Sequence, residues 1–491
     1  MRIIYFDIDS LRPDHLGCYG YGRDTSPNID QIAQEGVVFG NCFTSDSPCV
    51  PSRAALFSGR FGVQNGVVTH WGPGSEFRFP AQDTGLDQDF RQDMPLFSRH
   101  LRQYGWDTIS FSSFADRHQA PWFLAGWNET HNFTLKMGSE NADEVADAVI
   151  PWLETKGTKD QYFLHIHFWD PHRKYTMPQE WADRFKSDSL PPWPDADTLA
   201  VQQTADYGPC TPTELWRDFE TSPVATMPDA IANIDDLHKM IDGYDGTIRY
   251  VDHYIGLIRN TLKKLGVWDD TAIIVSADHG ESMGEHAVFG NHVNASESTH
   301  RVPLIIRWPD GGRHHVKDDR LLYQLDLTRT LCELLDIPAP EGWQGQPFTD
   351  AIKGGIVRSQ RQHLIWSHGL YTCQRAVRTK EWLLLYTYHP GLYAWDPVSL
   401  YHVSSDPYET NNLVNTNSEK VSELSVLLDE WYRKHVYGPT GSPDPMQQVI
   451  ATGPWKYIKL SPWLERLRQH DKATAALAIE ERLALWPKIA P

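Results

Sequence analysis

Residues 272–280 read Ala-Ile-Ile-Val-Ser-Ala-Asp-His-Gly, a short apolar run that passes directly into an Asp-His pair. A run of this length is typical of a strand that is buried on both faces of a parallel sheet. Residues 2–9 show the same pattern, because Arg-Ile-Ile-Tyr-Phe is followed by Asp7 and Asp9. Ligands of open α/β sheets bind beyond the carboxyl ends of the strands, so both segments predict a polar site there.

Short apolar runs alternate with segments of helical periodicity as far as about residue 360. The expected helices are residues 28–36, 94–104, 139–155 and 236–265, and further expected strands are residues 37–39, 108–111, 162–168 and 302–308. This alternation predicts an α/β fold with a large, mostly parallel sheet sandwiched by helices. Residues 189–235 are rich in Pro and Asp and are expected to form a long irregular insertion.

The pattern changes after about residue 360, where short strands with turn signals follow one another and precede an amphipathic helix. The expected elements are strands at 363–366, 374–377, 381–388 and 400–403 and a helix at 417–435. We therefore expect a catalytic domain (1–360), a small α+β subdomain with an antiparallel sheet (361–440) and a C-terminal helical arm (441–491). An amphipathic helix expected at 463–486 must cover its apolar face against another subunit, the mouth of the site or its own chain.

Composition and charge limit the possible classes of function. The 491 residues include 45 Lys+Arg and 64 Asp+Glu, which gives a formal net charge of −19. This acidic balance argues against binding to nucleic acid or to an anionic membrane. The six cysteines show neither CxxC spacing nor a disulfide framework, and the N-terminal apolar run is too short for a signal peptide. No apolar stretch reaches transmembrane length, so we expect a cytoplasmic protein.

The residues that follow the two strands are suitable ligands for a divalent cation. Asp7 and Asp9 are two residues apart and therefore face the same side of their strand. Asp278 and His279 follow the second strand. Carboxylate oxygens suit Ca²⁺, Mg²⁺ or Mn²⁺, and one imidazole is tolerated. Taken singly, each Asp could instead cap a following helix.

Residues 49–60 read Cys-Val-Pro-Ser-Arg-Ala-Ala-Leu-Phe-Ser-Gly-Arg, and this segment resembles the signature of the formylglycine-dependent sulfatases of the alkaline phosphatase superfamily. Other segments resemble motifs of the same family in the same order. They are residues 9–20, 25–30, 170–172, 278–281, 301–305 and 400–413. The resemblance extends from residue 1 to about residue 435 and implies an alkaline phosphatase-like fold.

The resemblance implies that a maturation enzyme oxidises Cys49 to formylglycine. The hydrated aldehyde carries two hydroxyl groups, of which one attacks sulfur and the other later expels sulfate, which a thiol could not do. The resemblance also implies that Arg53 supports this nucleophile. Position 49 would share one divalent cation with Asp9, Asp278 and His279, and Asp7 could join them. Ca²⁺ is the expected metal, with Mn²⁺ or Mg²⁺ as alternatives.

His172 follows Asp-Pro, and the resemblance makes it a contact to the sulfate or to the leaving group. An imidazole can protonate a departing alkoxide. The chain departs from the family at two lysine positions, because residues 111–118 contain no Lys and residues 289–292 read Phe-Gly-Asn-His. We expect His292, or alternatively Asn291, to replace one of these lysines.

Other polar residues could compensate for the missing lysine charge. The candidates are His70, Arg117 and His118. Asn65 occupies a place where the family has a polar active-site residue, so we expect it to bind substrate. The same departures are similar to the phosphonate monoester and phosphodiester hydrolases of the superfamily, which remain the alternative activity. A catalytically inactive homologue that binds sulfated glycans is a third interpretation.

Three segments with tryptophans and cationic side chains suggest the substrate, namely residues 68–79, 116–127 and 173–235. Their tryptophans include Trp71, Trp122, Trp127 and Trp193, and their cationic residues include Arg78, Arg173 and Lys174. A tryptophan offers a flat apolar face to a pyranose ring, and an arginine can bind a carboxylate through two hydrogen bonds. We expect a small sulfated carbohydrate, with a uronic acid as one component. Alternatively, these tryptophans fill the core.

Overall fold

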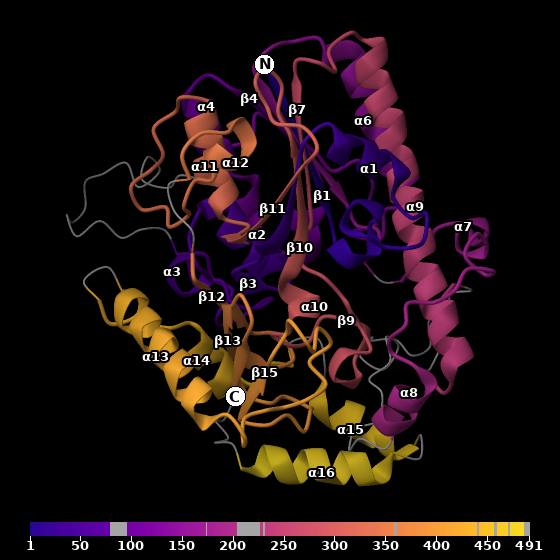
Figure 1. The fold of residues 1–491 in the computed structure, drawn as a ribbon, viewed down its shortest axis with the longest axis vertical. Helices are drawn as coiled ribbons and strands as arrows, with labels where there is room; N and C mark the ends of the chain where they lie inside the picture. The colour runs from indigo at the N-terminus through magenta and orange to yellow at the C-terminus, as the bar shows by residue number, and fades with distance from the viewer. Residues whose placement is uncertain are drawn as a thin grey trace.

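The computed structural model describes residues 1–78, 96–172, 174–203, 226–228, 231–357, 361–438, 441–455, 459–469 and 472–485. Figure 1 shows a large sheet with helices on both sides, a smaller sheet below it and a pair of helices at the bottom. This is the α/β architecture with a small antiparallel sheet that the sequence predicts.

The large sheet has eight strands in the order β11-β2-β10-β7-β1-β6-β4-β5. Their bounds are β1 (Arg2–Ile8), β2 (Val37–Phe43), β4 (Asp107–Phe111), β5 (Glu129–His131), β6 (Tyr162–Phe168), β7 (Thr271–Ser276), β10 (Arg301–Arg307) and β11 (Val316–Tyr323). The central β1 is parallel to β6 and β7, and Asp7 lies opposite both His167 and Ser276. This register brings the carboxyl ends of β1, β6 and β7 to the same edge, as expected for buried parallel strands.

Helices cover both faces of the large sheet. The long α9 (Ile234–Lys264) contacts α1 (Pro27–Gln34) and α6 (Ala142–Lys156) on one face. The other face carries α2 (Cys49–Ser58), which contacts α4 (Phe97–Gln103) and α11 (Asp326–Leu334). The Asn233 side chain accepts hydrogen bonds from two backbone N–H groups of the first turn of α9, which fixes where that helix begins.

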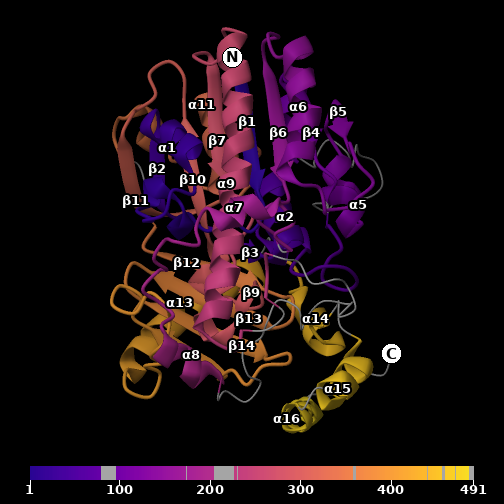
Figure 2. The ribbon, with the colours of Figure 1, turned by 90° about the vertical axis from the view of Figure 1, so that its right-hand side faces the viewer.

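The smaller sheet has five strands in the order β15-β14-β13-β12-β3. They are β3 (Asp46–Ser47), β12 (His363–His368), β13 (Cys373–Thr379), β14 (Leu383–His389) and β15 (Val398–Tyr401), and α13 (Ser418–His435) packs against them. The edge strand β3 comes from the N-terminal part of the chain and immediately precedes α2. The smaller sheet therefore supports the segment that leads to Cys49, and Figure 2 shows β3 below α2 and above β13.

The structure differs from the sequence-based expectations at several elements. The large sheet is mixed, because β10 is antiparallel to both β7 and β2. The strands β5 and β11 are short or partly exposed and were not expected from the sequence. The insertion contains α8 (Ala196–Gln203), while residues 204–225 lie outside the described part of the chain.

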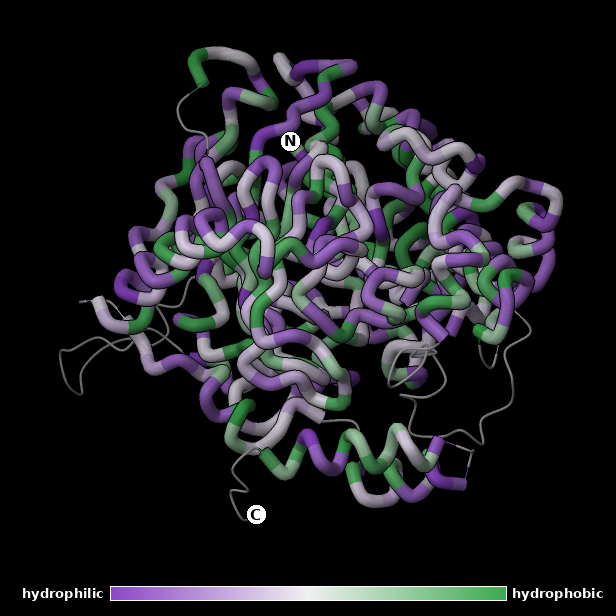
Figure 3. The backbone as a smooth tube through the Cα atoms, turned by 60° about the horizontal axis from the view of Figure 1, so that its bottom comes forward, coloured by the Kyte–Doolittle hydropathy of each residue, from purple (hydrophilic) through white to green (hydrophobic). Residues whose placement is uncertain are grey.

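The C-terminal arm packs against its own chain. The helix expected at 463–486 is instead a pair, α15 (Leu460–Gln469) and α16 (Ala473–Ala484), preceded by α14 (Met446–Thr452). Figure 3 shows hydrophobic and hydrophilic residues alternating along this pair. The buried face of this pair packs against two apolar segments of the same chain, one around residues 288–293 and one around residue 371. The cluster that they form includes Trp463, Leu464, Ile479, Val288, Val293 and Tyr371.

Deleting residues 446–491 should lower the melting temperature and kcat/KM together. Val288 and Val293 bracket the segment that carries His292, and both lose their cover in the truncated protein. Thermal unfolding and steady-state kinetics measure the effect, with Leu477→Ala as the control because that side chain is 54% exposed. An unchanged melting temperature would show that the arm does not stabilise this part of the chain. Association through the arm stays a prediction.

Candidate active site

The ends of β1 and β7 and the first turn of α2 meet at one place. Asp9, Cys49, Asp278 and His279 are buried there, and one ligand atom from each lies within 4.8 Å of the others. Asp9 follows β1, whereas Asp278 and His279 follow β7. The structure therefore brings together the four residues that the sequence places in one metal site.

Arg53 is the centre of the ion-pair network in this site and is only 1% exposed. Its Nε and Nη2 donate to the two oxygens of Asp7, at 2.8 and 3.1 Å. Its Nη1 donates to Asp9 Oδ2 at 3.1 Å and to Asp278 Oδ2 at 2.6 Å. Since Arg53 lies one helical turn after Cys49, this network fixes α2 on the ends of the strands.

The buried network carries more negative than positive charge. One guanidinium faces three carboxylates, those of Asp7, Asp9 and Asp278. Burial and the neighbouring Asp9 and Asp7 carboxylates raise the pKa of Asp278 well above its usual value, although Arg53 opposes the shift. Buried charges need partners, and a divalent cation would neutralise the two uncompensated charges.

His279 presents a free lone pair to this group. Its Nδ1 donates to the Gly280 carbonyl oxygen at 2.8 Å, which leaves Nε2 as the acceptor nitrogen. That Nε2 lies 3.4 Å from Asp278 Oδ2 and 3.8 Å from Asp9 Oδ1. Two carboxylates and a correctly oriented imidazole form a donor set that fits a divalent cation such as Ca²⁺ or Mn²⁺.

Cys49 is the first residue of α2 and lies against the same group. Its Sγ is 3.1 Å from His279 Nε2, and its side chain is buried. Without a bound cation, burial and the charges of Asp9 and Asp278 raise the pKa of the Cys49 thiol well above its usual value. The helix N-terminus favours negative charge at this position, as a nucleophilic oxygen there requires.

Two predicted site residues have other roles in the structure. Both oxygens of Asp7 are occupied by Arg53, and Oδ2 also accepts from His165 at 3.1 Å, so Asp7 positions Arg53 and is not in the metal-ligand group. Asn65 donates to the Arg60 carbonyl and the Ser58 hydroxyl and accepts from the Val67 N–H. These local bonds occupy the Asn65 amide, so the structure offers no support for a substrate contact there, and that role stays a prediction.

Two further histidines converge on Cys49. Ligand atoms of Cys49, His172 and His292 lie within 4.8 Å of one another. The rings of His172 and His292 are 5.7 Å apart, and His292 is 4.2 Å from the ring of His279. The His292 Nδ1 lies 3.3 Å from Glu281 Oε1, which orients its ring. Both residues are thus placed to exchange protons with groups bound at position 49.

His70 and His118 form a second wall of the site. The Val50 N–H donates to His70 Nε2 at 3.3 Å, so His70 lies beside the start of α2. The His118 ring is 4.7 Å from that of His70, and neither of its nitrogens has a hydrogen-bond partner within the described part of the chain. Burial lowers the pKa of both histidines well below the usual value, so they face the site as neutral imidazoles.

Arg117 is held by Trp169, whose ring also contacts His118 of this wall. Its guanidinium contacts the face of Trp169, 5.0 Å from the ring centroid, and donates to the Met137 carbonyl oxygen. Trp169 also contacts the rings of His118, His167 and His172. Trp169 was not expected from the sequence, because a buried tryptophan at a strand end looks like any other core residue.

The predicted sugar platforms are only partly supported. Trp122 and Trp127 are buried, and their rings stack on Phe77 and Phe163, so they belong to the core. The Trp71 indole donates to the His118 carbonyl oxygen, which places it near the histidine wall. Arg78 donates to the Pro443 carbonyl oxygen, and Arg173 lies outside the described residues.

Asp278→Ala should abolish stoichiometric metal binding, whereas Asp7→Asn should retain it. Asp278 supplies an oxygen to the ligand group, but both oxygens of Asp7 bind Arg53. The measurement is the metal content of the purified variants by plasma mass spectrometry. Full metal content in Asp278→Ala, or loss in Asp7→Asn with intact folding, would contradict this ligand assignment.

No helix in the described segments is long and apolar enough to cross a membrane.

The family model "Sulfatase" matches residues 2–337, and the model "N-sulphoglucosamine sulphohydrolase, C-terminal" matches residues 284–433. A relative, the N-acetylglucosamine-6-O-sulfatase of Bacteroides thetaiotaomicron, is 23% identical, with 92% of this chain and 89% of the relative covered.

Solved structures of two kinds share the fold. One holds its substrate D-glucosamine-2-N,6-O-disulfate; it is 21% identical, with 88% of this chain and 97% of the other covered, at a TM-score of 0.66. The phosphonate monoester hydrolase of Agrobacterium radiobacter is 20% identical, with 88% of this chain and 94% of the other covered, at a TM-score of 0.64. The family match covers more than half of the chain and agrees with the geometry around Cys49. The chain therefore belongs to the sulfatase family, the sulfuric ester hydrolases of the alkaline phosphatase superfamily.

Proposed function

We propose that the protein is a metal-dependent carbohydrate sulfatase whose nucleophile is formylglycine derived from Cys49. The observation that carries this proposal is the buried group of Asp9, Cys49, Asp278 and His279, with Arg53 bound to both carboxylates. The donor set and its excess negative charge suit one divalent cation, with Ca²⁺ as the first choice because two of the four ligands are carboxylates and formylglycine would add a third oxygen ligand. A formylglycine-generating enzyme is the implied maturation partner.

The residues present can perform both halves of sulfate ester hydrolysis. One hydroxyl of the hydrated aldehyde at position 49 forms a bond to sulfur while the bond from sulfur to the substrate oxygen breaks. The departing alkoxide takes a proton from His172 or His292, which both lie beside position 49. The imidazole that gave up its proton would then accept the proton of the second hydroxyl, the carbonyl would re-form as the bond from its carbon to the sulfate oxygen breaks, and water would add to the aldehyde to restore the two hydroxyls. A bound divalent cation supplies Lewis-acid stabilisation of the negative charge on oxygen during these steps.

The carbohydrate substrate is proposed from the relatives and from the aromatic side chains near the site. One relative is named an N-acetylglucosamine-6-O-sulfatase, and one similar structure holds a sulfated glucosamine. Trp71 lies beside the His70 and His118 wall, where a sugar ring could contact it. Sulfate oxygens would accept hydrogen bonds from the neutral imidazoles of that wall.

Wild-type enzyme should hydrolyse sulfated mono- and disaccharides with higher kcat/KM than para-nitrophenyl sulfate or a phenyl phosphonate ester. The comparison uses steady-state kinetics on fully matured, metal-loaded protein. The phosphonate ester tests the alternative activity. His292 favours that activity, because it stands at a position where many sulfatases have a lysine. Higher efficiency on the phosphonate ester would assign the chain to that alternative, and preference for the aryl sulfate would contradict a carbohydrate substrate.

A further inference from the structure

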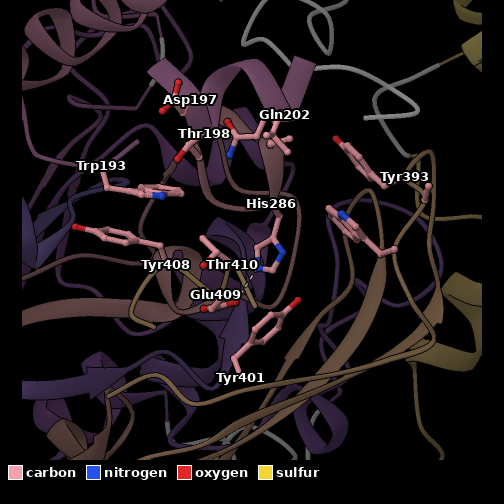
Figure 4. A pocket seen from close by; sticks show the side chains of 14 residues that line it. Trp193, Asp197, Thr198, Gln202, His286, Tyr393, Tyr401, Tyr408, Glu409 and Thr410 are labelled. Carbon is pink, nitrogen blue, oxygen red and sulfur yellow. Dashed lines mark hydrogen bonds and ion pairs between the residues drawn. The ribbon is translucent and has the colours of Figure 1, made fainter. Parts of the chain in front are cut away.

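A second cavity lies outside the group around Cys49. It has a volume of about 780 Å³ and is bounded by α8, by η4 (Glu285–Ala287) and by residues 393–410 at the end of the smaller sheet. Figure 4 shows Trp193 and Tyr408 on one side, Tyr393 on the other, and His286 with Glu409 between them. We call this the aromatic cavity. Its volume falls in the range of roughly 300–1,000 Å³ that is typical of small-molecule sites.

The walls of the aromatic cavity are two preformed pairs of stacked rings. Trp193 stacks on Tyr408 with centroids 4.2 Å apart and planes 8° from parallel. Trp395 stacks on Tyr393 with centroids 4.4 Å apart and planes 5° from parallel. Trp193 and Trp395 are only half-buried, so each keeps part of a flat face accessible. Because each ring is held by its partner, a ligand pays little conformational entropy to use these walls.

The polar groups of the cavity indicate the charge of its ligand. Asp197, Thr198 and Gln202 lie at one end, as Figure 4 shows. At the floor, His286 Nε2 lies 2.7 Å from Glu409 Oε2, and Glu409 Oε1 accepts from the Glu297 N–H at 2.8 Å. The described lining residues include neither Lys nor Arg. This lining suits the hydroxyl and apolar faces of an uncharged sugar, and it disfavours the uronic acid that the sequence suggested.

Both walls continue into the active site. The segment that leads to α8 begins directly after His172. The η4 turn is the tip of a hairpin of β8 (Ser282–Met283) and β9 (Phe289–Asn291), and the hairpin ends adjoin His279 and His292. Gln202 Nε2 donates to the Gly284 carbonyl oxygen at 2.6 Å and so ties α8 to this hairpin. His292 lies five residues after Ala287 at the tip, so at about 3.3 Å per strand residue the tip lies at most about 16 Å from His292, a span that the sulfated unit and a neighbouring sugar unit cover together.

We propose that the aromatic cavity binds an uncharged sugar ring attached to the sulfated unit of the substrate, a proposal that rests on the carbohydrate sulfatase activity proposed above. The stacked walls contact the faces of the ring. Asp197, Thr198 and Gln202 accept or donate hydrogen bonds to its hydroxyl groups. The active site then recognises the sulfate, whereas the aromatic cavity distinguishes a disaccharide from a monosaccharide.

The test compares kcat/KM for a sulfated monosaccharide and for disaccharides in which the same unit carries either a neutral hexosamine or a uronic acid. Wild-type enzyme should favour the neutral disaccharide. Trp395→Ala and Trp193→Ala should each lower the ratio of disaccharide to monosaccharide efficiency by about tenfold, the size expected for losing one aromatic anchor. Tyr437→Ala is the matched control, because Tyr437 belongs to the same part of the chain and is 74% exposed.

Calorimetry with the unsulfated neutral disaccharide separates this proposal from the sulfatase activity. Binding that Trp395→Ala weakens and Tyr437→Ala leaves unchanged would support the cavity as a sugar site. If wild-type enzyme hydrolyses sulfate esters but its efficiency ratio and sugar binding equal those of Trp395→Ala, the cavity proposal is wrong and the sulfatase proposal stands. If no sulfate ester is hydrolysed but sugar binding still depends on Trp395, the failure belongs to the proposed activity alone.

Discussion

Replacing Cys49 with Ala should lower kcat for sulfate ester hydrolysis by at least about a thousandfold, since loss of a catalytic nucleophile removes most of an enzyme's acceleration. Cys49→Ser should be almost as inactive. A serine hydroxyl could attack sulfur, but it has no second hydroxyl to expel sulfate, so the enzyme would stop as a sulfate ester. Single-turnover kinetics with an aryl sulfate would distinguish these two variants, because only the Ser variant can release alcohol once.

The folding of both Cys49 variants must be checked, because Cys49 is buried at the start of α2. Neither replacement adds volume, so the melting temperature should stay close to that of the wild type. Metal content should also remain measurable, since Asp9, Asp278 and His279 are unchanged. Multiple turnovers by Cys49→Ser at the wild-type rate would contradict the requirement for formylglycine.

Replacing Arg53 with Ala should destabilise the metal-free protein by about 3–5 kcal/mol, the usual cost of removing one partner of a buried ion pair. The change leaves Asp7, Asp9 and Asp278 without the one guanidinium that binds all three. Chemical denaturation of chelator-treated protein measures the loss. Arg53→Lys should be less damaging to stability but still inactive, because an ammonium cannot donate to three carboxylates in the same geometry.

A double-mutant cycle locates the cause of this destabilisation. Combining Arg53→Ala with Asp7→Asn removes one of the three stranded carboxylates, so the pair should be more stable than Arg53→Ala alone. Asp14→Asn is the control for the aspartate change, because Asp14 pairs with Arg12 and does not contact Arg53. If Arg53→Ala lowers the free energy of unfolding by the same amount in the wild-type and in the Asp7→Asn protein, Arg53 acts through packing and not through charge.

The central strands and the positions of the candidate metal ligands could be predicted from the sequence, because buried parallel strands have a strong local pattern. Arg2–Ile8 and Thr271–Ser276 are largely apolar runs that are followed closely by Asp9 and by Asp278-His279, and both strands are buried throughout. Elements with weak patterns were missed. The exposed start of Val316–Tyr323 lacks a buried strand's continuous apolar run, and no local signal shows that Arg301–Arg307 runs antiparallel.

Side-chain roles were harder to predict than positions. Asp7 and Asp9 face the same side of one strand, as expected, yet only the structure shows that Arg53 occupies both oxygens of Asp7. Asn65 has a residue type that suits substrate binding, but a turn of its own loop uses its amide. The first case depends on a contact between segments far apart in sequence, the 2.8 Å from Arg53 to Asp7, and the second on the exact geometry of a local turn.

The requirement for formylglycine is tested most directly by measuring turnover as a function of the extent of conversion at position 49. Protein is produced with graded amounts of a formylglycine-generating enzyme, and the mass of the peptide that contains residue 49 gives the converted fraction of each preparation. If formylglycine is the nucleophile, kcat on a sulfated sugar rises in proportion to that fraction and extrapolates to no turnover for unmodified Cys49. Full activity in a preparation whose peptide carries only the thiol would contradict it.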